Sequence, residues 1–141
     1  MILLRHRVGR LLETRFATPI DPPELDAFDR TRALLRASLG EERVVVMDFR
    51  RAAILPPELA DKLVDLLHGP NPKLLRNGVL VPTASATVAM QLSRIVRQAN
   101  NDRRRVFRDT RDLETWLGEV LDEPERDRLK RFLLEDALAQ G

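Results

Sequence analysis

The feature that most constrains this sequence is the apolar run Val44-Val45-Val46-Met47-Asp48-Phe49 near its middle. Three consecutive β-branched residues favour an extended backbone, because their side chains lose rotamer freedom in a helix. Apolar and polar residues do not alternate in the run, so the pattern predicts a strand that is covered on both faces. Segments with helical periodicity flank it. The sequence therefore predicts an α/β fold in which helices pack in layers against a sheet.

The composition indicates one globular domain. With 141 residues, of which 43% are hydrophobic, the chain is large enough to bury a single core. Its 24 basic and 22 acidic residues nearly balance, and the absence of cysteine excludes disulfides, thiolate metal sites and cysteine nucleophiles. No apolar run approaches the roughly 20 residues that a membrane-spanning helix needs. Residues 1–7 are too short and too soon charged for a signal peptide, so we expect a cytoplasmic location.

Turn and capping signals divide the rest of the chain into strands and helices. Gly9 suits a hairpin turn, and Asp21-Pro22-Pro23-Glu24 has the residues of a helix start, with Asp21 as the cap and Glu24 in the place a capping box requires. The predicted strands are residues 2–7, 11–17, 43–49, 78–82 and 104–108. The predicted helices begin at Asp21, within residues 54–59, at Thr83 or Ser85, near Thr110 and at Pro124.

These elements predict a single α/β domain with a mixed sheet of four or five strands that is covered by helices. The predicted order is ββαβαβαα, a hairpin followed by two βαβ units, with an extra helix at the C-terminus. Parallel strands joined by helices require right-handed crossovers.

Residues 44–67 resemble the STAS domain (sulfate transporter and anti-sigma-factor antagonist), and in particular its SpoIIAA-like members. The resemblance rests on a strand of the type Val-Val-Val-Met-Asp-Phe, a short bend and then a helix. Residues 78–81 and the helix after them resemble the family's fourth strand and third helix, and residues 106–117 resemble its closing strand and helix. The resemblance implies a STAS-like domain over residues 1–121 and a helical extension, 122–141, packed on the same domain.

The chain departs from the family at the position of the phosphoacceptor. In phosphorylated members an aspartate–serine pair opens the helix after the central strand, whereas this chain has Leu55-Pro56-Pro57-Glu58 there, with no hydroxyl. The resemblance therefore implies a non-enzymatic regulatory domain that binds a protein partner without the phosphorylation switch. The partner-binding residues that it implies, at the start of the second helix, are Pro57, Glu58, Asp61 and Lys62.

Arginines gather where the last predicted strand begins. The candidates for a weak anion-binding site are Arg103, Arg104, Arg105 and Arg108. Such a cluster is able to hold phosphate groups or acidic side chains of a partner. Because Asp102, Asp109 and Asp112 intervene, solvated charge with local pairing is the competing interpretation. A protein partner ranks ahead of nucleic acid or anionic lipid.

Other site types find no support in the sequence. His6 and His68 fall on different elements, and no group has metal-ligand spacing. Thr83-Ala84-Ser85-Ala86-Thr87 lacks the glycines of a nucleophile elbow, and no glycine-rich phosphate loop occurs. We expect no enzymatic activity, no cofactor and no metal.

One alternative function and one alternative assembly stay open. SpoIIAA-like domains are similar in topology to CRAL-TRIO lipid-binding domains, and several helices here are rich in leucine, so a small-ligand or lipid carrier is the second interpretation. Leucine stripes are, however, also typical of an ordinary core. The last helix either packs on the domain or mediates a homodimer.

Overall fold

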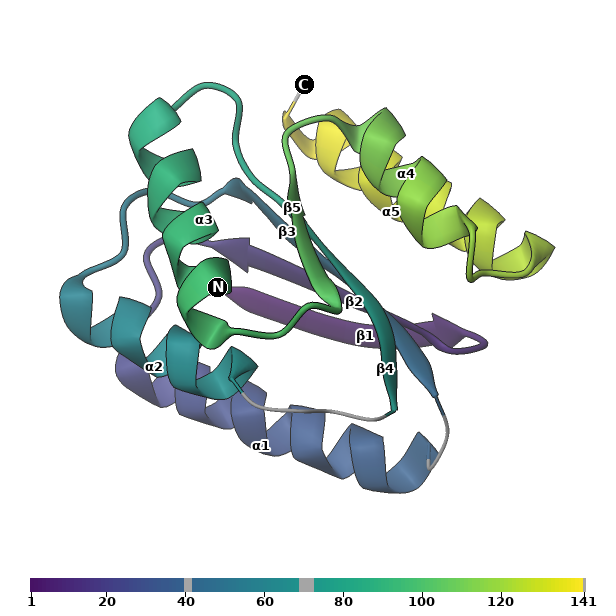
Figure 1. The fold of residues 1–141 in the computed structure, drawn as a ribbon, viewed down its shortest axis with the longest axis horizontal. Helices are drawn as coiled ribbons and strands as arrows, with labels where there is room; N and C mark the ends of the chain where they lie inside the picture. The colour runs from purple at the N-terminus through teal and green to yellow at the C-terminus, as the bar shows by residue number, and fades with distance from the viewer. Residues whose placement is uncertain (40–41, 69–72, 141) are drawn as a thin grey trace.

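The centre of the fold is a mixed sheet with the strand order β1-β2-β3-β4-β5 (Figure 1). The computed structural model describes residues 1–39, 42–68 and 73–140. β1 (Ile2–Val8) pairs antiparallel with β2 (Leu11–Ala17) through a turn in which Gly9 has a φ of +56°. β2, β3 (Arg43–Arg51), β4 (Leu74–Leu80) and β5 (Arg104–Phe107) then pair in parallel. The predicted α/β class is confirmed.

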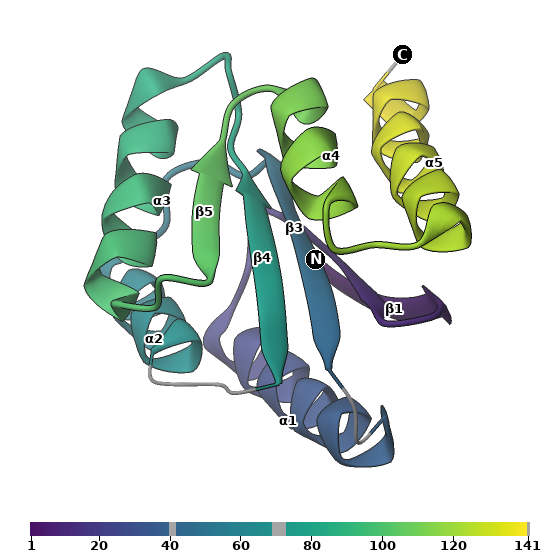
Figure 2. The ribbon, with the colours of Figure 1, turned by 45° about the vertical axis from the view of Figure 1, so that its right-hand side comes forward.

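Five helices cover the sheet in two layers (Figure 2). The crossovers between the parallel strands are α1 (Pro22–Leu39), α2 (Pro57–Leu67) and α3 (Ala86–Ala99), which lie on one face. α4 (Thr110–Gly118) and α5 (Glu123–Gln140) lie on the other. The order is ββαβαβαβαα. The predicted order ββαβαβαα thus leaves out one βα unit, although the strands and helices predicted one by one include the third crossover to residues 104–108.

The central strand β3 supplies both cores. Val45, Met47 and Phe49 pack against the α1–α3 layer. Val44 and Val46 point the other way, into a second apolar cluster with α4 and α5. Because successive side chains of a strand alternate between faces, only a strand that is apolar throughout suits this position. The predicted buried strand is confirmed.

The predicted helix starts are mostly confirmed by their caps. The Asp21 carboxylate accepts from the Glu24 N–H at 2.8 Å, and Ser85 rather than Thr83 caps α3. The Glu24 carboxylate does not complete a capping box with Asp21, because it accepts from the Ile2 N–H of β1 at 3.0 Å. Glu24 therefore ties α1 to the sheet.

One strand begins earlier than the sequence predicts. β4 starts at Leu74, four residues before the predicted start at Gly78, and it includes the fully buried Asn77. The Asn77 amide donates to the Val45 carbonyl at 3.0 Å and accepts from Arg104 at 2.7 Å, so its polar atoms are satisfied inside the sheet.

Every helix in the described ranges is too short or too polar to span a bilayer.

Candidate anion-binding pocket

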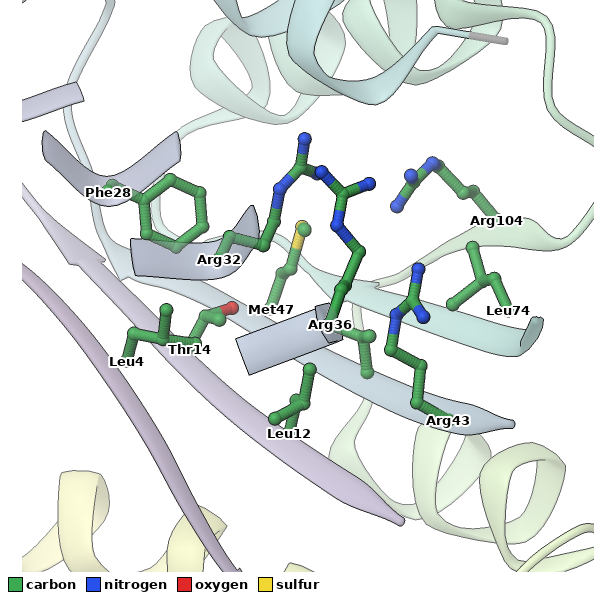
Figure 3. Close-up of a pocket in the computed structure, with 11 residues that line it drawn as sticks. Leu4, Leu12, Thr14, Phe28, Arg32, Arg36, Arg43, Met47, Leu74 and Arg104 are labelled. Atoms are coloured by element: carbon green, nitrogen blue, oxygen red, sulfur yellow. The ribbon is translucent and has the colours of Figure 1, made fainter. Parts of the chain in front are cut away.

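A pocket on the α1–α3 side of the sheet is lined by four arginines (Figure 3). Arg32 and Arg36 come from α1, and they share one helix face because they are four residues apart. Arg43 is the first residue of β3, and Arg104 is the first residue of β5. Figure 3 shows the four side chains gathered around one space. We call this group the arginine pocket.

The floor and walls of the arginine pocket are mostly apolar. They consist of Leu4, Leu12, Thr14, Phe28, Val45, Met47 and Leu74. The one polar side chain in this set, Thr14, donates to the Val46 carbonyl at 2.9 Å. Charge–charge repulsion between the arginines is therefore poorly screened.

Two of the four arginines are fixed by acceptors of the fold. Arg32 donates to the Leu66 carbonyl and to the Asp29 carboxylate, each at 3.0 Å, while its buried Nε has no partner. Arg104 donates to the Leu67 carbonyl at 3.2 Å and to the Asn77 side chain. Since Leu66 and Leu67 end α2, these bonds also satisfy carbonyls that a helix terminus leaves open.

The other two arginines find no such partners among residues 1–39, 42–68 and 73–140. In the described part of the chain, the guanidinium groups of Arg36 and Arg43 make no hydrogen bond or ion pair. Arg43 is only 4% exposed. A buried charge without a counter-ion is costly, since little water remains to solvate it. Of the four cations, only Arg32 has a carboxylate partner among the described residues, namely Asp29, whose side chain is 53% exposed.

The pKa values of the arginines report the same repulsion. Burial, together with the smaller effect of the charges of Arg32, Arg43 and Arg36, lowers the pKa of Arg104 to about 10. Burial and neighbouring arginines also lower the pKa values of Arg32 and Arg43. Each shift means that the folded protein disfavours the charged form. A bound anion would reverse this effect.

The size of the pocket limits what enters it. The enclosed volume is about 20 Å³, close to the space that one water molecule occupies. One oxygen atom of an anionic group fits inside, and the rest of the ligand would stay at the mouth.

The arginines predicted as an anion site do not act together. Successive residues of β5 face opposite sides of the sheet, so Arg104 joins the pocket while Arg105 stacks on Trp116, 4.7 Å from the ring centroid. Arg103 donates to the Leu74 carbonyl at 3.1 Å, and Arg108 is exposed beyond the end of β5. Only Arg104 of the predicted set lines the pocket.

Sequence reasoning missed Arg32, Arg36 and Arg43. A partial signal was present, because Arg32 and Arg36 lie one turn apart and Arg32 is one turn after the inward-facing Phe28. The decisive fact is not local. The sheet register pairs Arg43 with Leu74 and Arg104 with Asn77, which brings the starts of β3 and β5 to one edge.

The predicted partner-binding residues lie outside the pocket. Pro57, Glu58 and Asp61 are exposed at the start of α2. Lys62 is partly buried and lies 3.6 Å from Asp26 of α1, in a groove between the two helices. The structure therefore leaves the first three accessible and engages the fourth in an ion pair.

Among the residues that the structure describes, no group of three or more histidine, cysteine, aspartate or glutamate side chains is suited to a metal ion. Comparisons of the chain with protein-family models, with curated proteins and with solved structures found no match.

Proposed function

We propose that this chain is a non-enzymatic regulatory binding domain that recognises an anionic group of its ligand or partner in the arginine pocket. The observation that carries the proposal is the buried guanidinium of Arg43, which faces three other arginines and has no counter-ion among the described residues. A fold that keeps such repulsion gives up stability, and groups with strongly perturbed pKa values are typical of functional sites.

A purely structural role accounts for only half of the group. Arg32 and Arg104 bond to the last carbonyls of α2, where the negative end of the helix dipole also favours a cation. Within the described ranges, the guanidinium groups of Arg36 and Arg43 make no comparable bond. An anion between them supplies the partner that the described residues do not.

Thermal unfolding in different anions tests the proposal. At constant ionic strength, exchange of chloride for phosphate or sulfate should raise the Tm of the wild type, because a ligand that binds only the folded state stabilises it. Arg43→Met should abolish most of this increase. Arg108→Gln, which removes the same charge from an exposed site outside the pocket, should leave it unchanged. An equal increase in all three proteins would contradict the proposal.

A second candidate function is a STAS-like interaction with a protein partner at the start of α2. It is supported by the resemblance of residues 44–67 to that family and by the exposure of Pro57, Glu58 and Asp61. Ile54, just before this surface, is 49% exposed, and an apolar residue beside charged ones is common at interfaces.

Affinity capture with matched variants tests the second candidate. The wild type should retain a stoichiometric protein that the double variant Glu58→Lys, Asp61→Lys loses, while Arg97→Glu on α3 keeps it. Equal capture by all three proteins would contradict a partner at this surface.

The cavities offer little room for the lipid-carrier alternative. Besides the arginine pocket, the apolar cavity between Phe16, Phe49 and Leu59 measures about 10 Å³. Neither holds an acyl chain, and the larger groove between α1 and α2, about 240 Å³, is lined mainly by the charged side chains of Asp26, Asp29, Lys62 and Asp65. Native mass spectrometry of gently purified protein tests this alternative, which predicts a bound lipid mass.

A further inference from the structure

We infer that the anionic group held by the arginine pocket is a phosphomonoester in its dianionic form. The inference rests on the proposed function and specifies the ligand class of the same site. It is drawn from the charge, the shape and the size of the pocket.

The charge of the pocket exceeds what a monoanion compensates. Four guanidinium groups line it, and the one carboxylate that pairs with any of them, among the described residues, is the half-exposed Asp29. Arg36, Arg43 and Arg104 are left without a carboxylate in that part of the chain. A carboxylate or sulfate ester brings a single negative charge, whereas a phosphomonoester brings nearly two at neutral pH.

The directions from which the arginines approach also favour a phosphoryl group. Arg36 reaches the space from α1, Arg43 from β3 and Arg104 from β5, so the donors do not lie in one plane (Figure 3). A carboxylate has two coplanar oxygens and is satisfied by one guanidinium fork. A phosphomonoester has three terminal oxygens in a pyramid, and these accept from donors on several sides.

The size of the pocket separates the phosphoryl group from the rest of the ligand. The enclosed volume of about 20 Å³ has room for about one oxygen atom of the phosphoryl group, so the rest of that group lies at the mouth among the arginines and an organic chain is excluded. The alcohol part of the ester therefore remains at the mouth. A free phosphorylated metabolite and a phosphorylated protein side chain present the same group to the arginines.

Calorimetric titration with matched serine esters tests the inference. At about pH 7.5, O-phosphoserine should bind at least about tenfold more tightly than serine O-sulfate, because the extra charge strengthens several charge-assisted hydrogen bonds. The two esters share a tetrahedral head group and differ in charge. A short phosphoserine peptide distinguishes the two sources: tighter binding than O-phosphoserine indicates a protein ligand, and equal binding indicates a metabolite.

The pH dependence of binding provides an independent readout. The affinity for O-phosphoserine should fall as the pH drops below about 6, where the phosphoryl group takes up its second proton. The affinity for serine O-sulfate should stay constant over the same range, because its charge does not change. Among the described residues, the charged side chains that line the pocket are its four arginines, and Asp29 pairs with one of them, Arg32. The sulfate ester reports any titration of the protein itself.

Variants separate failure of this inference from failure of the proposed function. Arg43→Met and Arg36→Gln should each weaken O-phosphoserine binding by about tenfold or more, and Arg108→Gln should not. Equal affinities for the two esters would overturn the phosphomonoester assignment and leave anion recognition standing. Absence of binding by either ester, with no change in Tm in phosphate, would overturn both.

Discussion

Arginines are at least partly buried on both faces of this sheet, but in opposite circumstances. Under α5, Arg128 makes a bidentate pair with the fully buried Glu13, at 2.7 and 2.8 Å, and Arg50 pairs in the same way with Asp48. We call these pairs, with their neighbours Arg5, Arg15 and Glu135, the ion-pair network. On the other face, the arginine pocket has four cations and one half-exposed carboxylate partner among the described residues.

The pKa values of the arginines are shifted in opposite directions in the two regions. The hydrogen bonds that Arg128 donates to Glu13 and Glu135 hold its pKa above the usual value, whereas burial and repulsion hold the pKa values of Arg32, Arg43 and Arg104 below it. Paired charges thus fix α5 to the sheet. Arg15 and Arg50 add to this attachment by donating to the Phe132 and Leu133 carbonyls of α5. The comparison teaches that burial of an arginine does not by itself indicate a binding site. Burial of an arginine without a counter-ion does.

The largest effect is expected from breaking the ion-pair network. Arg128→Met leaves the Glu13 carboxylate buried with only Arg5, 3.4 Å away, so the free energy of unfolding should fall by about 3 kcal/mol or more. Urea denaturation measures this loss. Adding Glu13→Gln to Arg128→Met should recover much of it, because no unpaired charge remains. A loss below about 1 kcal/mol for the single variant would show that the pair does not hold α5.

The same substitution in the arginine pocket should act in the opposite direction. Arg43→Met removes a buried charge that has no counter-ion among the described residues, so in chloride buffer the free energy of unfolding should rise by about 1 kcal/mol. Urea denaturation under the same conditions checks the sign. A clear loss of stability would mean that Arg43 supports the fold, and it would weaken the contrast between the two regions.

Alkaline pH should sharpen the contrast further. The pKa of Arg104 is lowered to about 10 in the folded protein, well below the ordinary value of arginine in the unfolded chain. Between these two pKa values the unfolded state binds more protons than the folded state, so the free energy of unfolding rises with pH. The charged Arg104 therefore destabilises the fold fully only below about pH 10. The stability of the wild type relative to Arg104→Met should therefore stay constant up to about pH 9 and increase as the pH rises past about 10. A constant difference would argue against the repulsion.

Acidic pH should affect the ion-paired face instead. Hydrogen bonds from Arg128 and Arg5 lower the pKa of Glu135 against the raising effect of burial. A lowered carboxylate pKa adds stability that is present above the ordinary value of 4.5 and is lost as the pH falls through the folded value. Glu135→Gln should therefore flatten the acid limb of a stability-versus-pH profile. An unchanged limb would place the acid sensitivity elsewhere.

The smallest effect is expected at Arg108, which is exposed and belongs to neither region. Arg108→Gln should change the free energy of unfolding by no more than about 0.5 kcal/mol. Its urea denaturation curve is the baseline for the other arginine variants, and a larger change would show that net charge alone affects stability.

Much of the architecture could be predicted from local sequence. The valine run of β3, the turn at Gly9 and the cap at Asp21 are local signals, and the structure has all three. The early start of β4 was missed, because Asn77 is a poor strand former until its amide bonds to Val45 and Arg104.

The candidate site could be predicted only in part, because it depends on tertiary pairing. Arg104 was singled out as one of a consecutive run, but alternation along β5 separates it from Arg105. From sequence alone, Arg43 is expected to be a solvent-exposed residue at the start of the valine run. In the structure it pairs with Leu74 of β4 and lines the pocket with arginines of α1. The buried Glu13 likewise looks exposed until α5 supplies Arg128. The STAS-like relationship stays a proposal.

Side-chain NMR of the arginine Nε–Hε groups during an O-phosphoserine titration tests the central claim most directly. We predict saturable shifts with one common dissociation constant at Arg36, Arg43 and Arg104, and unchanged signals at Arg128 and Arg50 of the ion-pair network. Uniform small shifts at all arginines, or none at Arg43, would contradict recognition of an anion by the arginine pocket.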